Sequence, residues 1–144
     1  MKIQRTVETA AAPAAVFAYL SDFTTTTEWD PGTVSTSRVS GDGDVGTEYH
    51  NVSKFMGRET ELTYRVIEHT PDRTFALRGE NKTVVAHDTM EIEPHGTGSR
   101  VTYTADFTFK GIGKFVAPLL APALKKLGDE AEDGLREALA KLPS

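Results

Sequence analysis

The sequence predicts an α+β protein in which an antiparallel sheet of about seven strands is covered by a long C-terminal helix. Three observations support this class. Residues 3–8 alternate as a strand does. Between residues 34 and 109, six strand-like segments are separated by short groups of turn residues, which is typical of an antiparallel meander. After Gly111 the apolar residues recur with the 3.6-residue period of a helix.

Two short helices are predicted between the first strand and the other six. Pro13 can begin a helix, because its missing N–H would have no partner in the first turn. The apolar face of this helix consists of Val16, Phe17 and Leu20. A second short helix carries Trp29, and the turn residues at 30–32 follow it.

The six later strands are joined by short connections rich in Gly, Pro, Asn and Asp. We predict these strands at residues 34–39, 47–55, 59–68, 75–78, 84–92 and 100–109. A Gly-x-Gly-x-x-Gly pattern at residues 41–46 lies in one of the connections. No helix follows it to hold a pyrophosphate, so we interpret it as a hairpin turn and not as a dinucleotide site.

The C-terminal segment forms one long apolar stripe. Its members are Ile112, Phe115, Val116, Leu119, Leu120, Leu124, Leu127, Ala131, Leu135, Ala138 and Leu142. Pro118 and Pro122 lie inside the stripe and should kink its first part or confine the regular helix to the residues after them. This helix alone is long enough to cover the apolar face of the sheet. We therefore expect one domain over residues 1–144, as a monomer or a homodimer.

The composition argues against several functions. The chain has 144 residues and a net charge of -5 without a basic cluster, so we expect no nucleic-acid partner. No apolar run approaches the roughly 20 residues of a membrane-spanning helix, so we expect no stable membrane insertion. The absence of cysteine suits a reducing compartment, and we expect a cytoplasmic protein. The four histidines show no metal-ligand spacing, so we expect neither a metal nor another cofactor.

Strand alternation predicts which side chains face the C-terminal helix. On the last strand the inward set is Val101, Tyr103, Ala105, Phe107 and Phe109. On the three strands before it the inward set is Leu62, Tyr64, Val66, Phe75, Leu77, Ala86, Asp88, Met90 and Ile92. The strand at 47–55 is ambiguous: Tyr49, Asn51, Ser53 and Phe55 face inward unless a bulge turns His50 inward instead.

Asp88 is the most informative member of the inward set. A carboxylate on a buried face needs a partner, water or a raised pKa. One interpretation makes it a general base or a ligand anchor, and the other pairs it with a nearby Tyr or Arg or places it at a wet rim. Tyr64 and Tyr103 are open to the same choice, because buried phenols are often core side chains with the hydroxyl at an edge.

Several segments resemble the SRPBCC superfamily, which contains START domains, polyketide cyclases and the major birch-pollen allergen. In the N-terminal segment the similar residues are Ala12-Pro13, Val16-Phe17, Leu20, Asp22 and Trp29. The hairpins are similar at residues 45–47, 55–58, 66–73 and 98–102. The resemblance implies a helix-grip fold with a cavity between the sheet and the C-terminal helix. Known members of the superfamily bind lipids, sterols, hormones or polyketides.

The leading hypothesis is therefore a protein that binds an apolar small molecule, such as a lipid, a polyketide or an aromatic metabolite. The expected ligand contacts are Trp29, Tyr49, Asn51, Ser53, Leu62, Tyr64, Phe75, Leu77, Asp88, Met90, Tyr103, Phe107, Phe115 and Leu119. The alternative is a polyketide cyclase, aromatase or dehydratase, in which Asp88, Tyr64, Tyr103 or His50 would transfer protons. A protein-interaction module is a third hypothesis, which the Thr-rich and charged outer set of the last strand disfavours.

Overall fold

The computed structural model describes residues 1–111 and 113–144 of the chain. The strands are β1 (Lys2–Thr9), β2 (Thr33–Ser40), β3 (Glu48–Phe55), β4 (Arg58–Thr70), β5 (Thr74–Glu80), β6 (Val84–His95) and β7 (Gly98–Phe109). The helices are α1 (Pro13–Leu20), the 3-10 helix η1 (Phe23–Thr25), α2 (Thr26–Trp29), α3 (Gly113–Val116), the 3-10 helix η2 (Ala117–Leu120) and α4 (Ala121–Ala140). The predicted order of strand, short helices, six strands and long helix is confirmed.

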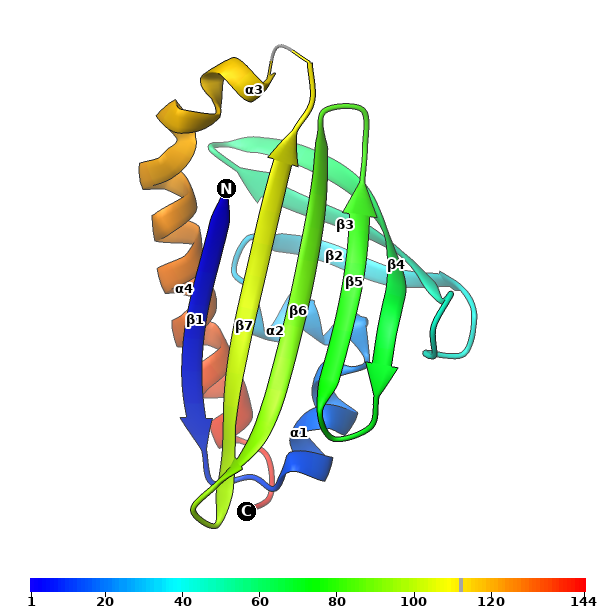
Figure 1. Ribbon diagram of the computed structural model, residues 1–144, viewed down its shortest axis with the longest axis vertical. Helices are drawn as coiled ribbons and strands as arrows, with labels where there is room; N and C mark the ends of the chain where they lie inside the picture. Colours follow the sequence, from blue (N-terminus) through cyan, green and yellow to red (C-terminus); the bar gives the residue numbers. More distant parts are fainter. Residues whose placement is uncertain (112) are drawn as a thin grey trace.

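The seven strands form one antiparallel sheet in the order β1-β7-β6-β5-β4-β3-β2. Figure 1 shows this sheet curving around α4, which runs along β1, while α1 and α2 lie behind the lower half of the sheet. Contacts of α4 with β1 and with α2 hold the helix on the concave face. The sheet thus grips its C-terminal helix, and the predicted helix-grip fold is confirmed.

Strand β6 extends beyond its predicted end at residue 92. The connection between the strands predicted at 84–92 and 100–109 is shorter than expected, because β6 continues through Pro94 and His95, which pair with Ser99 and Gly98 of β7. The chain reverses at Gly96, whose φ of 60° lies in the left-handed region that favours glycine. The β6–β7 pair therefore forms a long ribbon whose inner face supplies much of the concave surface.

The C-terminal stripe is divided where its prolines lie. The 3-10 helix η2 contains Pro118, and α4 begins with Pro122 in its first turn. Proline cannot donate the backbone hydrogen bond of a helix interior, so the regular helix is confined to the residues after Pro118. Ile112, which the stripe also included, lies outside the described residues.

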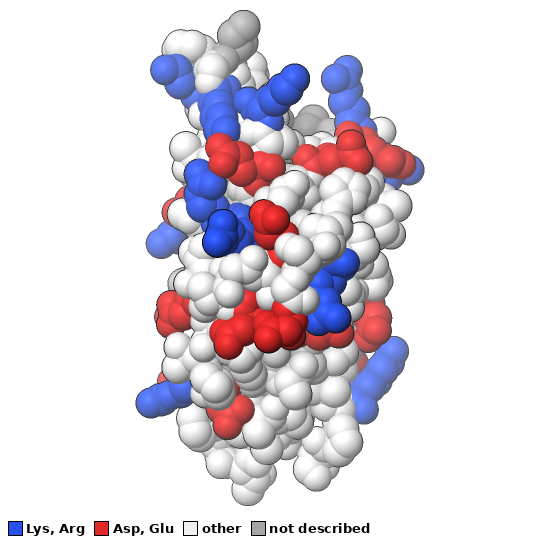
Figure 2. Space-filling view, turned by 90° about the vertical axis from the view of Figure 1, so that its right-hand side faces the viewer, with Lys and Arg blue, Asp and Glu red and all other residues white. Residues whose placement is uncertain are grey.

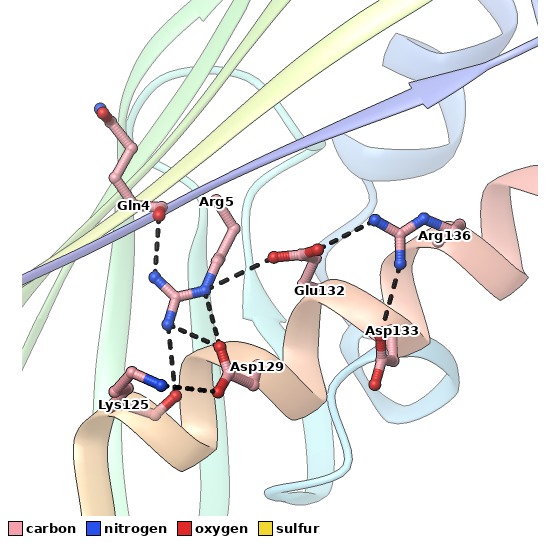
Figure 3. A network of polar contacts seen from close by, with 7 residues as sticks. All are labelled: Gln4, Arg5, Lys125, Asp129, Glu132, Asp133 and Arg136. Carbon is pink, nitrogen blue, oxygen red and sulfur yellow. Dashed lines mark hydrogen bonds and ion pairs between the residues drawn. The ribbon is translucent and has the colours of Figure 1, made fainter. Parts of the chain in front are cut away.

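An arginine of β1 attaches the long helix to the edge of the sheet (Figure 3). Arg5 Nη2 lies 2.9 Å from Asp129 Oδ1 and donates to the Lys125 carbonyl at 3.3 Å, and Arg5 Nε lies 3.5 Å from Glu132 Oε1. Arg136 extends the network along α4, 2.9 Å from Glu132 Oε2. Because these contacts join the first strand to the last helix, they help to fix how α4 lies across the concave face.

The residues predicted to face inward form the core. On β4, β5 and β6 all nine members of the predicted inward set are buried, as are Val101, Tyr103 and Ala105 on β7. The buried side of α4 consists of Leu124, Gly128, Ala131, Leu135, Ala138 and Leu139. Alternation along the strands therefore identified the inward side chains, and the helical period identified Leu124, Ala131, Leu135 and Ala138 but not Gly128 and Leu139.

Candidate functional site

A cavity of about 270 Å³ lies between the sheet and α4. Residues from β1, β3, β4, β6, β7, η2 and α4 line it, together with the connections after α2 and before β6. They are Ile3, Asp30, Gly32, Ser53, Lys54, Phe55, Thr60, Leu62, Tyr64, Thr83, Val84, Asp88, Tyr103, Ala105, Phe107, Phe109, Leu120, Leu124, Leu127, Gly128 and Ala131. An apolar wall with a few polar groups is typical of a small-molecule site.

Small residues on neighbouring strands leave room for the cavity. Strand register places Tyr64 opposite Gly79, Gly79 opposite Ala86, and Ala86 opposite Phe107. The two central positions of this row carry at most a methyl group. In the next row Asp88 lies opposite Ala105, again beside a small side chain. Gly79 makes room for the ring of Tyr64, which packs over it at the cavity wall, and Ala105 lies on the cavity wall itself.

Polar side chains meet at the buried end of the cavity. The carboxyl group of Asp88 accepts a long hydrogen bond of 3.5 Å from the Tyr103 hydroxyl at Oδ2. Asp88 is 6% exposed, and its Oδ1 finds no hydrogen-bond partner among the described residues. A buried polar atom without a partner is rare in folded proteins and requires an explanation. Asp88, which lines the cavity, therefore holds a buried acceptor without a partner in the described structure.

A second carboxyl group lines the same cavity. Asp30 follows α2, and it accepts hydrogen bonds from Gly32 N at 3.0 Å and from Thr33 Oγ1 at 3.2 Å. Burial is the main cause that raises the pKa of Asp30, and Glu130 on α4 raises it further. Asp30 in turn acts on Asp88, because the pKa of Asp88 rises to about 7 through burial and then through the charge of Asp30.

The two phenols of the cavity remain protonated at neutral pH. Burial is the main cause that raises the pKa of Tyr64, and the neighbouring charges of Asp88 and Asp30 add to it. The same causes, in the same order, raise the pKa of Tyr103. Each phenol can therefore donate one hydrogen bond, while Asp88 changes protonation state close to pH 7.

The structure sorts the predicted ligand contacts into three groups. Those on the cavity wall are Ser53, Leu62, Tyr64, Asp88, Tyr103 and Phe107. Those in the surrounding core, behind the wall, are Trp29, Tyr49, Asn51, Phe75, Leu77 and Met90. The last group, Phe115 and Leu119, is 74% and 78% exposed. The contact expected for this pair is corrected, because the break around Pro118 interrupts the helical period that placed both residues on the inner face.

The structure resolves the ambiguity of β3. Its register with β4 is regular, so Tyr49 and Asn51 are buried and His50 lies on the outer face. His50 Nε2 is 3.1 Å from Glu61 Oε1, a contact outside the cavity. The irregularities of this part of the sheet lie in β2 instead. The candidate role of His50 in proton transfer is corrected accordingly, because its imidazole faces away from the cavity.

Trp29 supports the site from behind. Its ring packs edge-on against Tyr103 with 5.4 Å between ring centroids, and its Nε1 lacks a hydrogen-bond partner within the described parts of the chain. Helix α4 comes close to the Trp29 backbone at Gly134, where a β-carbon would lie 1.9 Å from the Trp29 carbonyl oxygen. Trp29 thus connects α4 with the polar end of the cavity without lining it.

Sequence reasoning did not include Asp30 or Gly79 in the site. Asp30 stands in a turn, where Asp is common for local reasons, and only the return of the chain past β3 places it at the cavity. A signal did exist for Gly79, because a glycine inside a strand often marks a close approach. Its partner, the ring of Tyr64, becomes evident only from the strand register.

Several lysines lie near the part of the cavity wall that Thr83 and Phe109 form. Figure 2 shows basic side chains gathered at the upper end of one face and mixed charges below them. Two connections meet there, because Lys110 N donates to the Thr83 carbonyl at 2.8 Å. These connections carry Lys82 and Lys110, and α3 adds Lys114 beside the exposed Phe115. The fold thus brings together lysines that are dispersed in the sequence.

The fold and the cavity together define the class of protein. A curved seven-stranded sheet that grips a C-terminal helix around an apolar cavity is the helix-grip fold of the SRPBCC superfamily. Residues 1–140 match the family model described as "Polyketide cyclase / dehydrase and lipid transport", and the chain belongs to this family. No curated protein matches the sequence.

Solved structures agree with this fold. The Zhui aromatase/cyclase from Streptomyces sp. R1128 superposes with a TM-score of 0.82 at 14% identity, over 96% of this chain and 93% of that one. TTHA0849 from Thermus thermophilus gives 0.80 at 17% identity, over 96% and 97%. A START superfamily protein from Mycobacterium smegmatis gives 0.73 at 16% identity, over 96% of both chains. At such identities the likeness shows the fold alone.

No helix in the described parts of the chain is long and apolar enough to cross a membrane.

Proposed function

We propose that the protein binds an apolar small molecule, such as a lipid, a polyketide or an aromatic metabolite, in the cavity between the sheet and α4. The observation that carries this proposal is the cavity itself, whose wall is mostly apolar and whose buried end holds Asp88, Tyr64 and Tyr103. An apolar wall supplies affinity through burial of the ligand, and a few polar groups orient it. We further propose a cytoplasmic location, as a monomer or a homodimer.

A neutral fluorescent probe tests the binding proposal. N-phenyl-1-naphthylamine becomes brighter when it leaves water for an apolar site, so saturable brightening at a 1:1 ratio is expected. Ala105→Leu should weaken the binding, because this residue lines the cavity and the larger side chain would occupy its space. Thr104→Leu on the outer face of β7 is the matched control and should bind as the native protein does. Absence of saturable binding, or equal binding by Ala105→Leu, would refute the proposal.

A dehydratase or cyclase activity is the second candidate, favoured by the unused Oδ1 of Asp88 beside two protonated phenols. In a β-hydroxy ketone, ionised Asp88 would take the proton α to the carbonyl. The β-hydroxyl would leave as water with a proton from Tyr64 or Tyr103, and the phenolate would then recover the proton held by Asp88. The products balance as one enone and one water. This scheme requires both groups within hydrogen-bond reach of the substrate.

The appearance of enone absorbance from a β-hydroxy aryl ketone tests this activity. Asp88→Asn and Tyr103→Phe should abolish turnover while binding of the neutral probe persists, because both substitutions preserve the shape of the cavity wall. If native turnover is present and both variants keep it, these two roles are wrong. If the native protein binds the probe but produces no enone above the buffer rate, the binding proposal stands alone.

A further inference from the structure

The carboxyl groups of the cavity have no basic counterpart on its wall. Asp30 and Asp88 line it, and among its described lining residues the one basic residue is Lys54. Lys54 belongs to the outward-facing set of β3, and it is exposed. Its backbone N–H donates to the Gly32 carbonyl at 2.7 Å, which brings its main chain to the cavity. The interior therefore holds two acids without a basic side chain to neutralise them.

Building such a cavity is costly for the fold. A carboxylate in a space with little water loses its hydration, and a second carboxylate nearby opposes its ionisation. Hydrogen bonds relieve Asp30, which accepts from Gly32 and Thr33. Asp88 receives only the long bond from Tyr103 and keeps Oδ1 without a partner in the described structure. A positive charge in the cavity would compensate both acids at once.

From this geometry we propose that the ligand is an apolar amine, whose ammonium group pairs with the carboxyl group of Asp88 while its apolar part fills the cavity towards α4. This inference rests on the proposed binding function and names the ligand class. The aromatic lining from Tyr64, Tyr103 and Phe107 suits a cation, because ring faces attract positive charge. A carboxylate ligand such as a fatty-acid anion is disfavoured, because it would add a third negative charge.

The lysines near Thr83 and Phe109 do not reverse this preference. Lys110 already forms an ion pair with Glu80, and Lys82 and Lys114 are exposed, where water and salt screen their charges. Asp88 acts inside the protein at short range, where an interaction between charges is stronger. The lysines therefore affect how fast an amine enters more than how tightly it is held.

Three probes with one ring system and different polar groups test the inference. They are 1-naphthylmethylamine, 1-naphthalenemethanol and 1-naphthoate, titrated by calorimetry at pH 8. We expect the amine to bind at least about tenfold more tightly than the alcohol, as a charge-assisted hydrogen bond provides, and the carboxylate to bind most weakly. Asp88→Asn should remove the advantage of the amine over the alcohol. Asp133→Asn, the same change on the exposed side of α4, should keep it.

A pH series adds a second readout that does not depend on the variants. The groups facing Asp88 are Asp30, Tyr64 and Tyr103, and Glu130 on α4 acts on Asp30. Both phenols stay neutral, and an alkylamine stays protonated between pH 6 and 8, so the carboxyl groups alone change charge there. The preference for the amine over the alcohol should therefore increase from pH 6 to pH 8.

The outcomes separate this inference from the binding proposal. If the alcohol binds and the amine binds no more tightly, or if the carboxylate binds best, the amine inference is wrong and the binding function stands. If none of the naphthalene probes binds and the neutral fluorescent probe also fails, both are wrong. If Asp88→Asn does not fold, the pH series and Asp30→Asn still decide: the advantage of the amine should increase from pH 6 to pH 8 in the native protein and should be smaller in Asp30→Asn.

Discussion

The ring of Tyr64 on β4 packs directly over the α-carbon of Gly79 on β5. A β-carbon at residue 79 would lie 2.6 Å from Tyr64 Cε1 and 2.8 Å from its Cδ1 and Cζ, closer than carbon atoms approach in folded proteins. The contact involves the body of a buried ring and not the end of a flexible chain. Gly79 therefore determines where the phenol of Tyr64 lies in the cavity.

Gly79→Ala should displace this ring and alter the cavity. We expect a loss of about 1–3 kcal/mol in the free energy of unfolding, as overpacking of a core costs, together with weaker probe binding. Urea denaturation and probe titration measure the two effects. Gly113→Ala is the matched control, because its β-carbon would make only ordinary contacts, the nearest at 3.8 Å. Unchanged stability and binding in Gly79→Ala would contradict the assigned role of this glycine.

Asp88 should make the stability depend on pH in an unusual direction. Its pKa in the folded protein is about 7, against an ordinary value of 3.8, so the unfolded chain releases this proton first as the pH rises. Asp88 therefore destabilises the fold progressively between about pH 4 and pH 7, by up to roughly 4 kcal/mol for a difference of this size. Asp30, whose pKa is also raised, acts with the same sign.

Asp88→Asn should remove this loss, because the amide stays neutral at every pH. The variant should gain stability relative to the native protein from pH 4 to pH 8, as measured by urea denaturation at several pH values. Asp133→Asn serves as the control on the exposed surface, with a curve parallel to that of the native protein. Parallel curves for Asp88→Asn as well would mean that this carboxyl group is not held in a costly environment.

Arg5→Met should weaken the attachment of α4 to β1. The guanidinium group of Arg5 is largely buried and contacts Asp129, Glu132 and the Lys125 carbonyl, so its removal takes away every one of these contacts between β1 and α4. We expect a loss of about 1–2 kcal/mol in the free energy of unfolding. Arg136→Met, at an exposed position that pairs only within α4, should have a smaller effect. If Arg5→Met and Arg136→Met lowered the free energy of unfolding equally, Arg5 would contribute no more than an exposed ion pair.

Leu124 and Leu119 test how the apolar stripe is divided. Leu124 is 4% exposed and lines the cavity, whereas Leu119 is 78% exposed in η2. Leu124→Ala should cost roughly 2–5 kcal/mol in thermal or urea unfolding, as core truncations do. Leu119→Ala should change stability by less than about 0.5 kcal/mol, as is usual at exposed positions. A large loss from Leu119→Ala would show that η2 packs on the core in solution.

Periodicity in the sequence was a reliable guide wherever the chain was regular. The alternation on β4, β5, β6 and β7 identified the inward side chains, including Asp88 and Tyr103, because successive residues of a strand face opposite sides. It failed at Phe115 and Leu119, where the backbone around Pro118 is not one continuous helix. For His50 the alternation allowed either face of the sheet, since a single bulge reverses the facing of every side chain after it in the strand.

The sequence by itself determined the fold class and the core, because both follow from local spacing that any regular strand or helix must obey. The tertiary structure alone decided the composition of the site. Asp30 and Asp88 are far apart in the chain, and only the packing of α2 and α4 on the sheet places both carboxyl groups in one cavity. The effect of the Asp30 charge on the pKa of Asp88 depends on the distances between these elements. So does the lack of a partner for Asp88 Oδ1 in the described chain.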